Sequence, residues 1–293
     1  MFKKRANINR VRSLVGKTPL VKVSDKIYAK LETRNLSGSI KDRTIAYIVK
    51  RDMLYGNIGE DTILCEATSG NAGISLSMIA ASIGNPCVIF MPKDAAGEQK
   101  KMIRVYGAKI IETPAGDLSG AIAMRDAFLK TNNNSWSPRQ FSNELAIDCH
   151  ERVTAPEIHK QVIDLNKRWV SFIHGAGSGS TIEGVRRYLK KSNMLTKVCM
   201  VSPAAPDHGI VGLNSSQKFL AKEENMDRII QISTEEAVQR AKLFIEETGI
   251  LVGISSGANL LASERWIRDN PINGVVITVL CDRGERYFSI YDK

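Results

Sequence analysis

Short apolar runs alternate along this chain with longer segments in which apolar residues recur every three or four positions. The short runs predict β-strands and the longer segments predict helices, each helix following its strand after a turn of small residues. Strands are expected at residues 27–31, 63–65, 87–91, 109–111, 170–173, 229–232 and 275–280, and helices at 42–54, 72–82, 97–106, 121–129 and 182–190. Ser233-Thr-Glu-Glu236 is a capping box, which predicts a further helix that ends at Gly249. Near-continuous apolar strands that alternate with helices are typical of parallel sheets covered on both faces, so the expected fold class is α/β with mostly parallel sheets covered by helices.

A polar stretch interrupts this alternation near the middle of the chain. Residues 132–137 read Asn-Asn-Asn-Ser-Trp-Ser. A length of 293 residues suits one large domain or two of medium size. A domain boundary is therefore expected between residues 135 and 145.

The composition is that of a globular protein, with 43% hydrophobic and 25% charged residues. The basic N-terminal residues are not followed by an apolar stretch, so no secretory signal is expected. The longest charge-free run, residues 67–92, carries too many hydroxyl, amide and glycine residues for a membrane helix. We therefore expect a cytoplasmic protein that does not bind a membrane.

Charge and cysteine content narrow the function classes further. The formal net charge is +10, and a nucleic-acid partner is one cause of such an excess. The basic residues are spread along the chain without aromatic-interleaved clusters, so nucleic-acid binding is not expected.

The five cysteines are scattered and the four histidines lack metal-like spacing, which argues against a disulfide framework and against a metal site. Cys65, Cys87, Cys199 and Cys281 lie in or beside apolar runs and are expected to be buried structural thiols.

Two glycine-rich segments stand at expected turns that lead into helices. Gly175-Ala-Gly-Ser-Gly-Ser-Thr181 follows an expected strand and precedes a helix. It could bind a phosphate through exposed backbone N–H groups, or it could be only a tight turn. Gly253-Ile-Ser-Ser-Gly257 matches the nucleophile elbow of α/β-hydrolases, but that triad needs a histidine after the serine, and the last histidine is His208. A serine hydrolase is therefore excluded.

Two further segments carry candidate chemistry. Thr68-Ser-Gly-Asn-Ala-Gly73 gathers hydroxyl, amide and backbone N–H groups at an expected helix start, where it could cap the helix or hold a substrate carboxylate. Lys41 follows a glycine turn and also begins a helix. Most lysines are solvated surface charges, but the helix dipole disfavours a cation at this position and so favours a neutral, nucleophilic amine.

Together these segments resemble the cysteine synthases (O-acetylserine sulfhydrylases) of the tryptophan-synthase-β-like pyridoxal-phosphate superfamily, over nearly the whole chain. The segments that carry the resemblance are Leu14-Val-Gly-Lys-Thr-Pro-Leu-Val-Lys22, Lys30-Leu-Glu32, Ser37-Gly-Ser-Ile-Lys-Asp-Arg43, Glu66-Ala-Thr-Ser-Gly-Asn-Ala-Gly73, 177–184 and 253–258. Glu66-Ala-Thr-Ser-Gly-Asn71 and residues 77–81 and 281–287 are most similar to the B-type isozyme.

The resemblance implies a fold, a cofactor and a reaction. The fold would be that of a fold type II enzyme, with a smaller α/β domain at residues 36–144 and a larger one formed by 1–35 and 145–293. Pyridoxal 5'-phosphate would lie in the cleft between them, and two chains would pair as a homodimer. The reaction would be β-replacement on O-acetylserine or O-phosphoserine through an aminoacrylate intermediate. Sulfide would then give L-cysteine, and thiosulfate would give S-sulfocysteine.

The resemblance also implies roles for individual residues. Lys41 would hold the cofactor covalently and move the Cα proton as general base and acid. Asn71 would hydrogen-bond the phenolic oxygen of the cofactor, and the neutral Ser255 hydroxyl would meet the pyridine nitrogen. The substrate carboxylate would be held by Thr68, Ser69, Gly70, Asn71 and Gln140. The cofactor phosphate would be held by Gly177, Ser178, Gly179, Ser180 and Thr181.

Several positions depart from the family pattern and leave the substrates open. Ala72 stands where the family usually has threonine, and the stretch from Pro203 to Asp227 is shorter than usual. Both the leaving group and the nucleophile therefore remain undetermined. Alternatives are β-replacement with an amine or homocysteine, serine/threonine dehydration, and a non-catalytic binding protein of the same fold.

Overall fold

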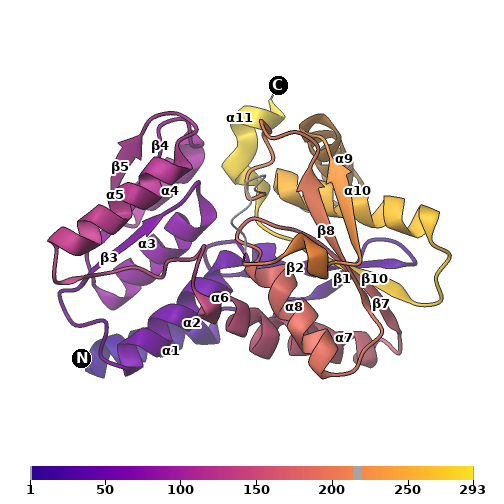
Figure 1. The fold of residues 1–293 in the computed structure, drawn as a ribbon, viewed down its shortest axis with the longest axis horizontal. Coiled ribbons are helices and arrows are strands. Elements are labelled where there is room, and N and C mark those ends of the chain that lie inside the picture. The colour runs from indigo at the N-terminus through magenta and orange to yellow at the C-terminus, as the bar shows by residue number, and fades with distance from the viewer. Residues whose placement is uncertain (1, 214–219, 293) are drawn as a thin grey trace. The chain divides into compact units, whose positions relative to one another are not determined.

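The computed structural model describes residues 2–213 and 220–292, and the chain divides into two compact units (Figure 1). Unit 1 comprises Met1–Gly16 and Asn35–Asn143, and unit 2 comprises Lys17–Arg34 and Glu144–Lys293. Both units combine a largely parallel sheet with helices, which confirms the α/β class.

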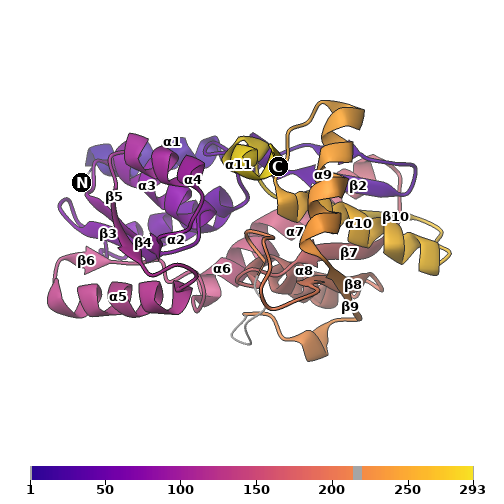
Figure 2. The same ribbon diagram turned by 90° about the horizontal axis from the view of Figure 1, so that it is seen from above.

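Unit 1 is built on a four-stranded sheet in the order β5-β4-β3-β6, and all three strand pairs are parallel. The strands are β3 (Ile63–Ala67), β4 (Cys87–Pro92), β5 (Lys109–Thr113) and β6 (Ser135–Trp136). Helix α5 (Leu118–Thr131) covers one face (Figure 2). The other face carries α1 (Phe2–Ser13), α2 (Lys41–Leu54), α3 (Asn71–Ile83) and α4 (Gly97–Val105).

The burial of this sheet explains the apolar runs in the sequence. All six residues of β4 are buried, as expected for a strand with helices on both faces. Ile89 and Met91 join the larger core cluster, whereas Val88 and Phe90 pack in the cluster on the α5 side. Successive side chains of one strand therefore fill two separate cores.

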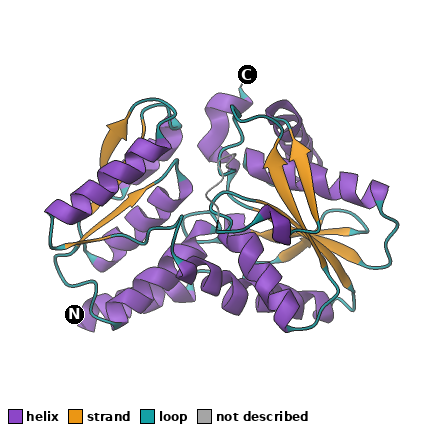
Figure 3. Cartoon of the chain, in the orientation of Figure 1, coloured by secondary structure: helices purple, strands orange, loops and turns teal. Residues whose placement is uncertain are grey.

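Unit 2 is built on a six-stranded sheet in the order β1-β2-β10-β7-β8-β9. Figure 3 draws the strands in orange. The strands are β1 (Leu20–Lys22), β2 (Ile27–Leu31), β7 (Trp169–Gly175), β8 (Lys197–Pro203), β9 (Arg228–Ile232) and β10 (Val275–Leu280). Only the β1–β2 pair is antiparallel. Helices α9 (Thr234–Thr248) and α10 (Ile254–Asp269) pack on one face and α7 (Ala155–Asp164) and α8 (Ser180–Lys191) on the other (Figure 1). In the described part of the chain, the remaining helices are α6 (Glu144–Cys149), a π-helix at His150–Thr154, α11 (Phe288–Tyr291) and 3-10 turns at Glu32–Arg34, Glu223–Asn225 and Gly284–Tyr287.

Every strand and helix that the apolar pattern predicts is present in the structure. The capping box is also confirmed, because Ser233 Oγ accepts a hydrogen bond from the Glu236 N–H at 3.2 Å and Gly249 ends the helix with a φ of 69°. Helices α1, α6, α7 and α11 and strands β6 and β8 were not predicted, and no bounds were predicted for the helix α10 that follows the Gly253 turn. Helix α10 begins with Ile-Ser-Ser-Gly, residues that give little helical signal.

The first residues of the chain group differently from the sequence-based expectation. Residues 1–16 belong to unit 1 rather than to the same unit as 17–34. The physical reason is that Ile8 and Val11 of α1 are buried in the unit 1 core, beside residues of α2 and α3. Within the described residues, no helix is long and apolar enough to cross a bilayer.

Candidate active site

Lys41 is the first residue of α2, and a buried acid fixes the turn in front of it. Asp42 is fully buried and accepts hydrogen bonds from the Ser37 hydroxyl and, at 2.6 Å, from the Ser37 N–H. A carboxylate in the first helical turn is also stabilised by the helix dipole. Gly38 has a φ of 91°, which a residue with a side chain rarely adopts. These features give the backbone at Lys41 a defined place at the start of the helix.

The Thr68–Gly73 segment forms the turn from β3 into α3. Thr68 is buried, and its hydroxyl accepts a hydrogen bond from the Gly70 N–H at 2.9 Å. The first i to i−4 bond of the helix runs from Ile74 N–H to the Gly70 carbonyl. The N–H groups before Ile74 therefore lie at the open N-terminus of α3, where they favour an anion. Ser69 is exposed beside them.

Gln140 reaches this turn because strands β3 and β6 are parallel neighbours. Their carboxyl ends lie at one edge of the sheet, and Gln140 follows β6. The Gln140 N–H donates to Glu66 Oε2 at 2.9 Å, and its side-chain amide lies 3.5 Å from the Ala67 carbonyl oxygen. The structure thus brings Gln140 next to the Thr68–Gly73 segment.

Glu66 is a fully buried carboxylate that sequence reasoning did not assign a role. It accepts hydrogen bonds from Arg125 Nη1 and from the Ala67 N–H, both at 2.8 Å. Burial raises the pKa of Glu66, and the Arg125 guanidinium and the backbone N–H groups oppose that rise. The signal in the sequence is one acid inside the apolar run of β3. Glu66 positions Gln140 by holding its backbone.

The glycine-rich segment at 175–181 forms the turn from β7 into α8 of unit 2. Gly179 precedes the helix with a φ of 82°. A Cβ on Gly177 would overlap the Gly212 carbonyl oxygen, and a Cβ on Gly179 would lie 2.6 Å from the Ala221 nitrogen. Glycine is therefore required at both positions, because neighbouring backbone lies directly against them.

The polar groups of this turn suit a phosphate. Ser178, Ser180 and Thr181 are buried hydroxyl residues at the N-terminus of α8, where backbone N–H groups are available to an anion. The nearby Glu183 is paired with Arg186 and Arg187, each at 2.8 Å. Burial by itself would raise the pKa of Glu183, but the two arginines lower it below its ordinary value. The positive charges of Arg186 and Arg187 thus compensate the negative charge of Glu183, which would otherwise repel a phosphate.

Ser255 lies near the same segment. It is buried in the first turn of α10, and a Cβ on Gly212 would lie 4.0 Å from its hydroxyl oxygen. Because Gly212 also contacts Gly177, the structure gathers the glycine-rich turn, Gly212 and Ser255 within unit 2. Asn259 strengthens this arrangement by accepting from the Gly175 N–H at 2.8 Å and donating to the Val279 carbonyl at 2.9 Å.

The two glycines around Ser255 have packing roles. A Cβ on Gly253 would overlap Asp282, and one on Gly257 would overlap the Ala237 carbonyl oxygen of the neighbouring helix α9. The glycines of the G-x-S-x-G match are thus explained by close packing. This agrees with the exclusion of a serine hydrolase from the order of the residues.

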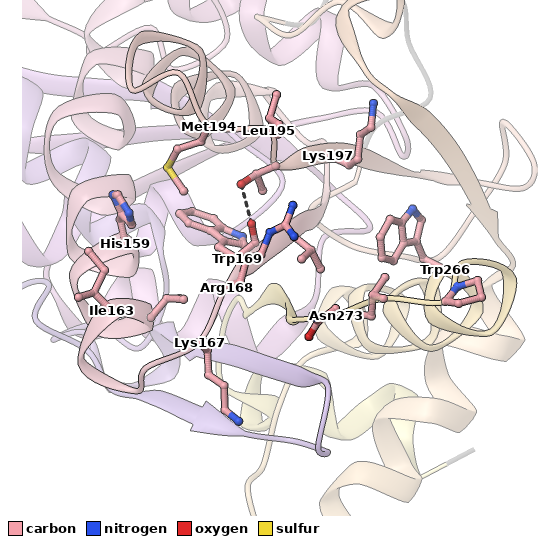
Figure 4. Close-up of a pocket in the computed structure, with 15 residues that line it drawn as sticks. His159, Ile163, Lys167, Arg168, Trp169, Met194, Leu195, Lys197, Trp266 and Asn273 are labelled. Atoms are coloured by element: carbon pink, nitrogen blue, oxygen red, sulfur yellow. Dashed lines mark hydrogen bonds between the residues drawn. The ribbon is translucent and has the colours of Figure 1, made fainter.

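A pocket of about 650 Å³ elsewhere in unit 2 contains none of the candidate residues. It lies at the amino ends of β7, β8 and β10, whereas the candidate turn follows the carboxyl end of β7. Figure 4 shows Trp169 and Trp266 on opposite sides of this pocket, with the Arg168 side chain between them. Among the described residues, no group of acidic, histidine and cysteine side chains could hold a metal ion.

The family model for pyridoxal-phosphate dependent enzymes matches residues 11–282 of this chain. The chain belongs to that family. The Cysteine synthase B of Campylobacter jejuni is 35% identical over 294 residues, which cover 96% of this chain and 97% of the relative. This similarity confirms the resemblance to cysteine synthases and the pyridoxal-phosphate cofactor.

Solved structures agree with this assignment. The hydrogen sulfide-producing enzyme of Fusobacterium nucleatum has a TM-score of 0.90 and 31% identity, covering 98% of this chain and 91% of the other. The O-acetylserine dependent cystathionine beta-synthase of Helicobacter pylori has a TM-score of 0.87 and 30% identity, covering 95% of this chain and 96% of the other. These similarities confirm fold type II.

The residues present fit the cofactor of the family. In unit 2, the turn before α8 offers hydroxyl and N–H donors for a phosphate. In unit 1, Lys41 lies at the start of α2, and the turn at Thr68–Gly73, called here the carboxylate-type turn, offers donors for a carboxylate at the start of α3. The roles of the individual site residues stay predictions. Part of the shortened stretch, residues 214–219, lies outside the described residues.

Proposed function

We propose that the protein catalyses β-replacement on an O-activated L-serine with a sulfur nucleophile. The donor would be O-acetylserine or O-phosphoserine, and the product would be L-cysteine with sulfide or S-sulfocysteine with thiosulfate. The single observation that carries the proposal is the similarity to Cysteine synthase B over 96% of the chain. The proposal is also supported by Lys41, by the donors for a carboxylate at Thr68–Gly73 and by the donors for a phosphate at Gly175–Thr181.

We propose roles for individual residues in holding the cofactor and in moving the proton. When bound, pyridoxal phosphate supplies an electron-withdrawing ring that stabilises negative charge at the substrate Cα. Lys41 holds the cofactor and then takes the Cα proton and returns it to the product. The turn from Gly177 to Thr181 holds the phosphate, and Asn71 donates to the phenolic oxygen.

The turn at the start of α3 holds the α-carboxylate of the substrate. Thr68, Ser69, Gly70 and Asn71 contribute hydroxyl, amide and N–H donors, and Gln140 adds its side-chain amide. Glu66 keeps Gln140 in reach through the backbone bond at 2.9 Å. A substrate carboxylate held at a helix N-terminus gains both hydrogen bonds and a favourable dipole.

The neutral hydroxyl of Ser255 would face the pyridine nitrogen. A hydroxyl stabilises a protonated ring less than a carboxylate does, so electron withdrawal is milder. Milder withdrawal favours loss of the β-substituent over formation of a long-lived carbanion. That balance suits replacement at Cβ.

Initial rates with two donors and two nucleophiles test this proposal. O-acetylserine and O-phosphoserine are each combined with sulfide or thiosulfate, and products are identified by mass spectrometry. Formation of cysteine or S-sulfocysteine from either donor is expected. If neither donor gives a product, the proposal is wrong, and assays with amines, homocysteine, L-serine and L-threonine would identify another reaction of the family.

We also propose that the protein works in the cytoplasm as a homodimer. None of the cysteines at positions 65, 87, 149, 199 and 281 forms a disulfide, as expected in a reducing compartment. Sedimentation of the purified protein should give twice the mass of one 32.3 kDa chain. A mass equal to one chain at all concentrations would refute the dimer.

A further inference from the structure

A second turn lies beside the carboxylate-type turn of unit 1. Strands β3 and β4 are parallel neighbours, so the turns that follow them meet at one edge of the sheet. The turn after β3 is Thr68–Gly73, and the turn after β4 leads into α4, whose first helical turn contains Gln99.

The Gln99 side chain packs directly against Gly70. A Cβ built on Gly70 would overlap Gln99 Oε1 and would lie 2.9 Å from Nε2. The amide therefore occupies the space that a larger residue at position 70 would fill. This contact accounts for glycine at that position.

The Gln99 amide is completely buried, yet both of its polar atoms lack a hydrogen-bond partner among the described residues. A buried amide is normally hydrogen-bonded, because an unsatisfied donor or acceptor costs free energy. Because the Gln99 amide lies beside a turn suited to ligand binding, we expect a second conformation of the protein in which this amide is hydrogen-bonded.

Contacts of the neighbouring Lys100 hold the first turn of α4, and with it the backbone of Gln99, in place. The next residue, Lys100, is bonded to Glu112 Oε1 of β5 at 2.7 Å and also donates to the Lys93 carbonyl. These contacts tie the first turn of α4 to two segments of the sheet edge. An adjustment that satisfies Gln99 must therefore come from the turn at residues 68–71.

We propose that Gln99 is a positioning residue for the substrate carboxylate, an inference that rests on the proposed function. When an amino-acid substrate binds, the turn at residues 68–71 shifts, and its backbone forms hydrogen bonds with the Gln99 amide. These bonds hold the N–H groups of the turn toward the carboxylate. Gln99 does not touch the substrate, because Gly70 lies between them.

The test compares the Gln99→Met holoenzyme with wild type and with Lys101→Met, a control at an exposed position on the same helix. Methionine keeps the approximate size of glutamine without its hydrogen bonds. We expect KM for the amino-acid donor to rise about tenfold, the loss of about one hydrogen bond, while kcat changes less than about threefold. The preference for O-acetylserine over its methyl ester should fall by a similar factor. Lys101→Met should behave as wild type.

Thermal unfolding supplies a measurement that does not depend on turnover. Because Gln99→Met removes an unsatisfied buried amide, the Tm without substrate should rise by roughly 2–4 °C. The further rise in Tm that L-alanine causes in wild type should be smaller in the variant. A merely structural glutamine would give the opposite sign, with a lower Tm and an unchanged response to L-alanine.

The outcomes separate this inference from the proposed function. If wild type uses neither serine donor, the proposed function fails. If wild type is active and Gln99→Met has an unchanged KM and an unchanged acid-to-ester preference, the inference about Gln99 alone is wrong. Gln99→Glu is a second variant, and its added negative charge should weaken donor binding more than methionine does.

Discussion

Two lysines of the same family motif have different surroundings. Lys30 is completely buried, and its ammonium contacts Glu157, the Thr18 carbonyl and, at 2.8 Å, Gln161 Oε1. Its charge and its donors are thus used within unit 2. Lys41 stands instead at a helix N-terminus after a glycine turn. Lys30 therefore has a structural role, and Lys41 stays the residue that we predict to take part in the chemistry.

The Ser255 hydroxyl gives a prediction about the electronic role of the protein. The Ser255→Asp variant should keep its cofactor, because the proposed phosphate contacts of the turn at 177–181 are unchanged. Its rate of β-replacement should fall at least about tenfold, since a carboxylate stabilises a protonated ring. Cofactor content is measured by absorbance and the rate by product formation. Ser255→Ala, which stays neutral, should lose less, and equal rates for Ser255→Asp and wild type would remove the residue from this role.

The thiols give a prediction about reactivity at the residue scale. Burial raises the pKa of both Cys65 and Cys87 to about 12 and that of Cys199 to about 11. These thiols form almost no thiolate at pH 8, and Cys149 is also buried. Cys281 was expected to be buried but is only half-buried, because it lies just past the end of β10. Ellman's reagent should therefore label only Cys281 in the folded protein and all five thiols after unfolding. Rapid labelling of two or more thiols in the folded state would contradict this burial.

At the scale of elements, parallel strands explain how distant segments meet. Strands β4, β3 and β6 are neighbours, so the turns that follow them lie along one edge of the unit 1 sheet. In unit 2, the turn after β7 contacts the loop that contains Gly212, which also lies near Ser255. The short strand β6 has only two residues, and its apolar signal is too short to predict.

Gly177 tests whether the packing of these turns supports cofactor binding. Gly177→Ala places a Cβ on the Gly212 carbonyl oxygen, so one of the two segments must move. We expect the Kd for pyridoxal phosphate to rise about tenfold or more, measured by equilibrium dialysis. Gly97→Ala is the matched control, because a Cβ there meets no atom within 4 Å. Equal affinities of the two variants would show that this contact does not matter for the cofactor.

At the scale of the molecule, much of the fold could be predicted from the sequence. The buried parallel strands produce apolar runs, and the helices that cover them produce a three-to-four-residue period, so both are visible without coordinates. The grouping of residues 1–16 with unit 1 could not be predicted this way. It depends on where Ile8 and Val11 find a core, and a local pattern does not contain that information.

The turns at 68–73 and 175–181 could be singled out from the sequence because each has an unusual local composition. The roles of Glu66 and Gln99 could not be predicted from the sequence, for a different reason. Each acts through a neighbour on another strand or helix, Glu66 through Gln140 and Gln99 through Gly70. Such partners are set by sheet order, which a single sequence does not reveal.

Covalent trapping of the cofactor shows whether Lys41 is the residue that binds pyridoxal phosphate. The purified protein is reduced with borohydride and digested, and the peptides are analysed by mass spectrometry. We expect a yellow protein, a cofactor-derived mass on the peptide that contains Lys41, and loss of both colour and turnover in Lys41→Ala. Cofactor fixed to another lysine, or a Lys41→Ala variant that keeps its colour and activity, would contradict it.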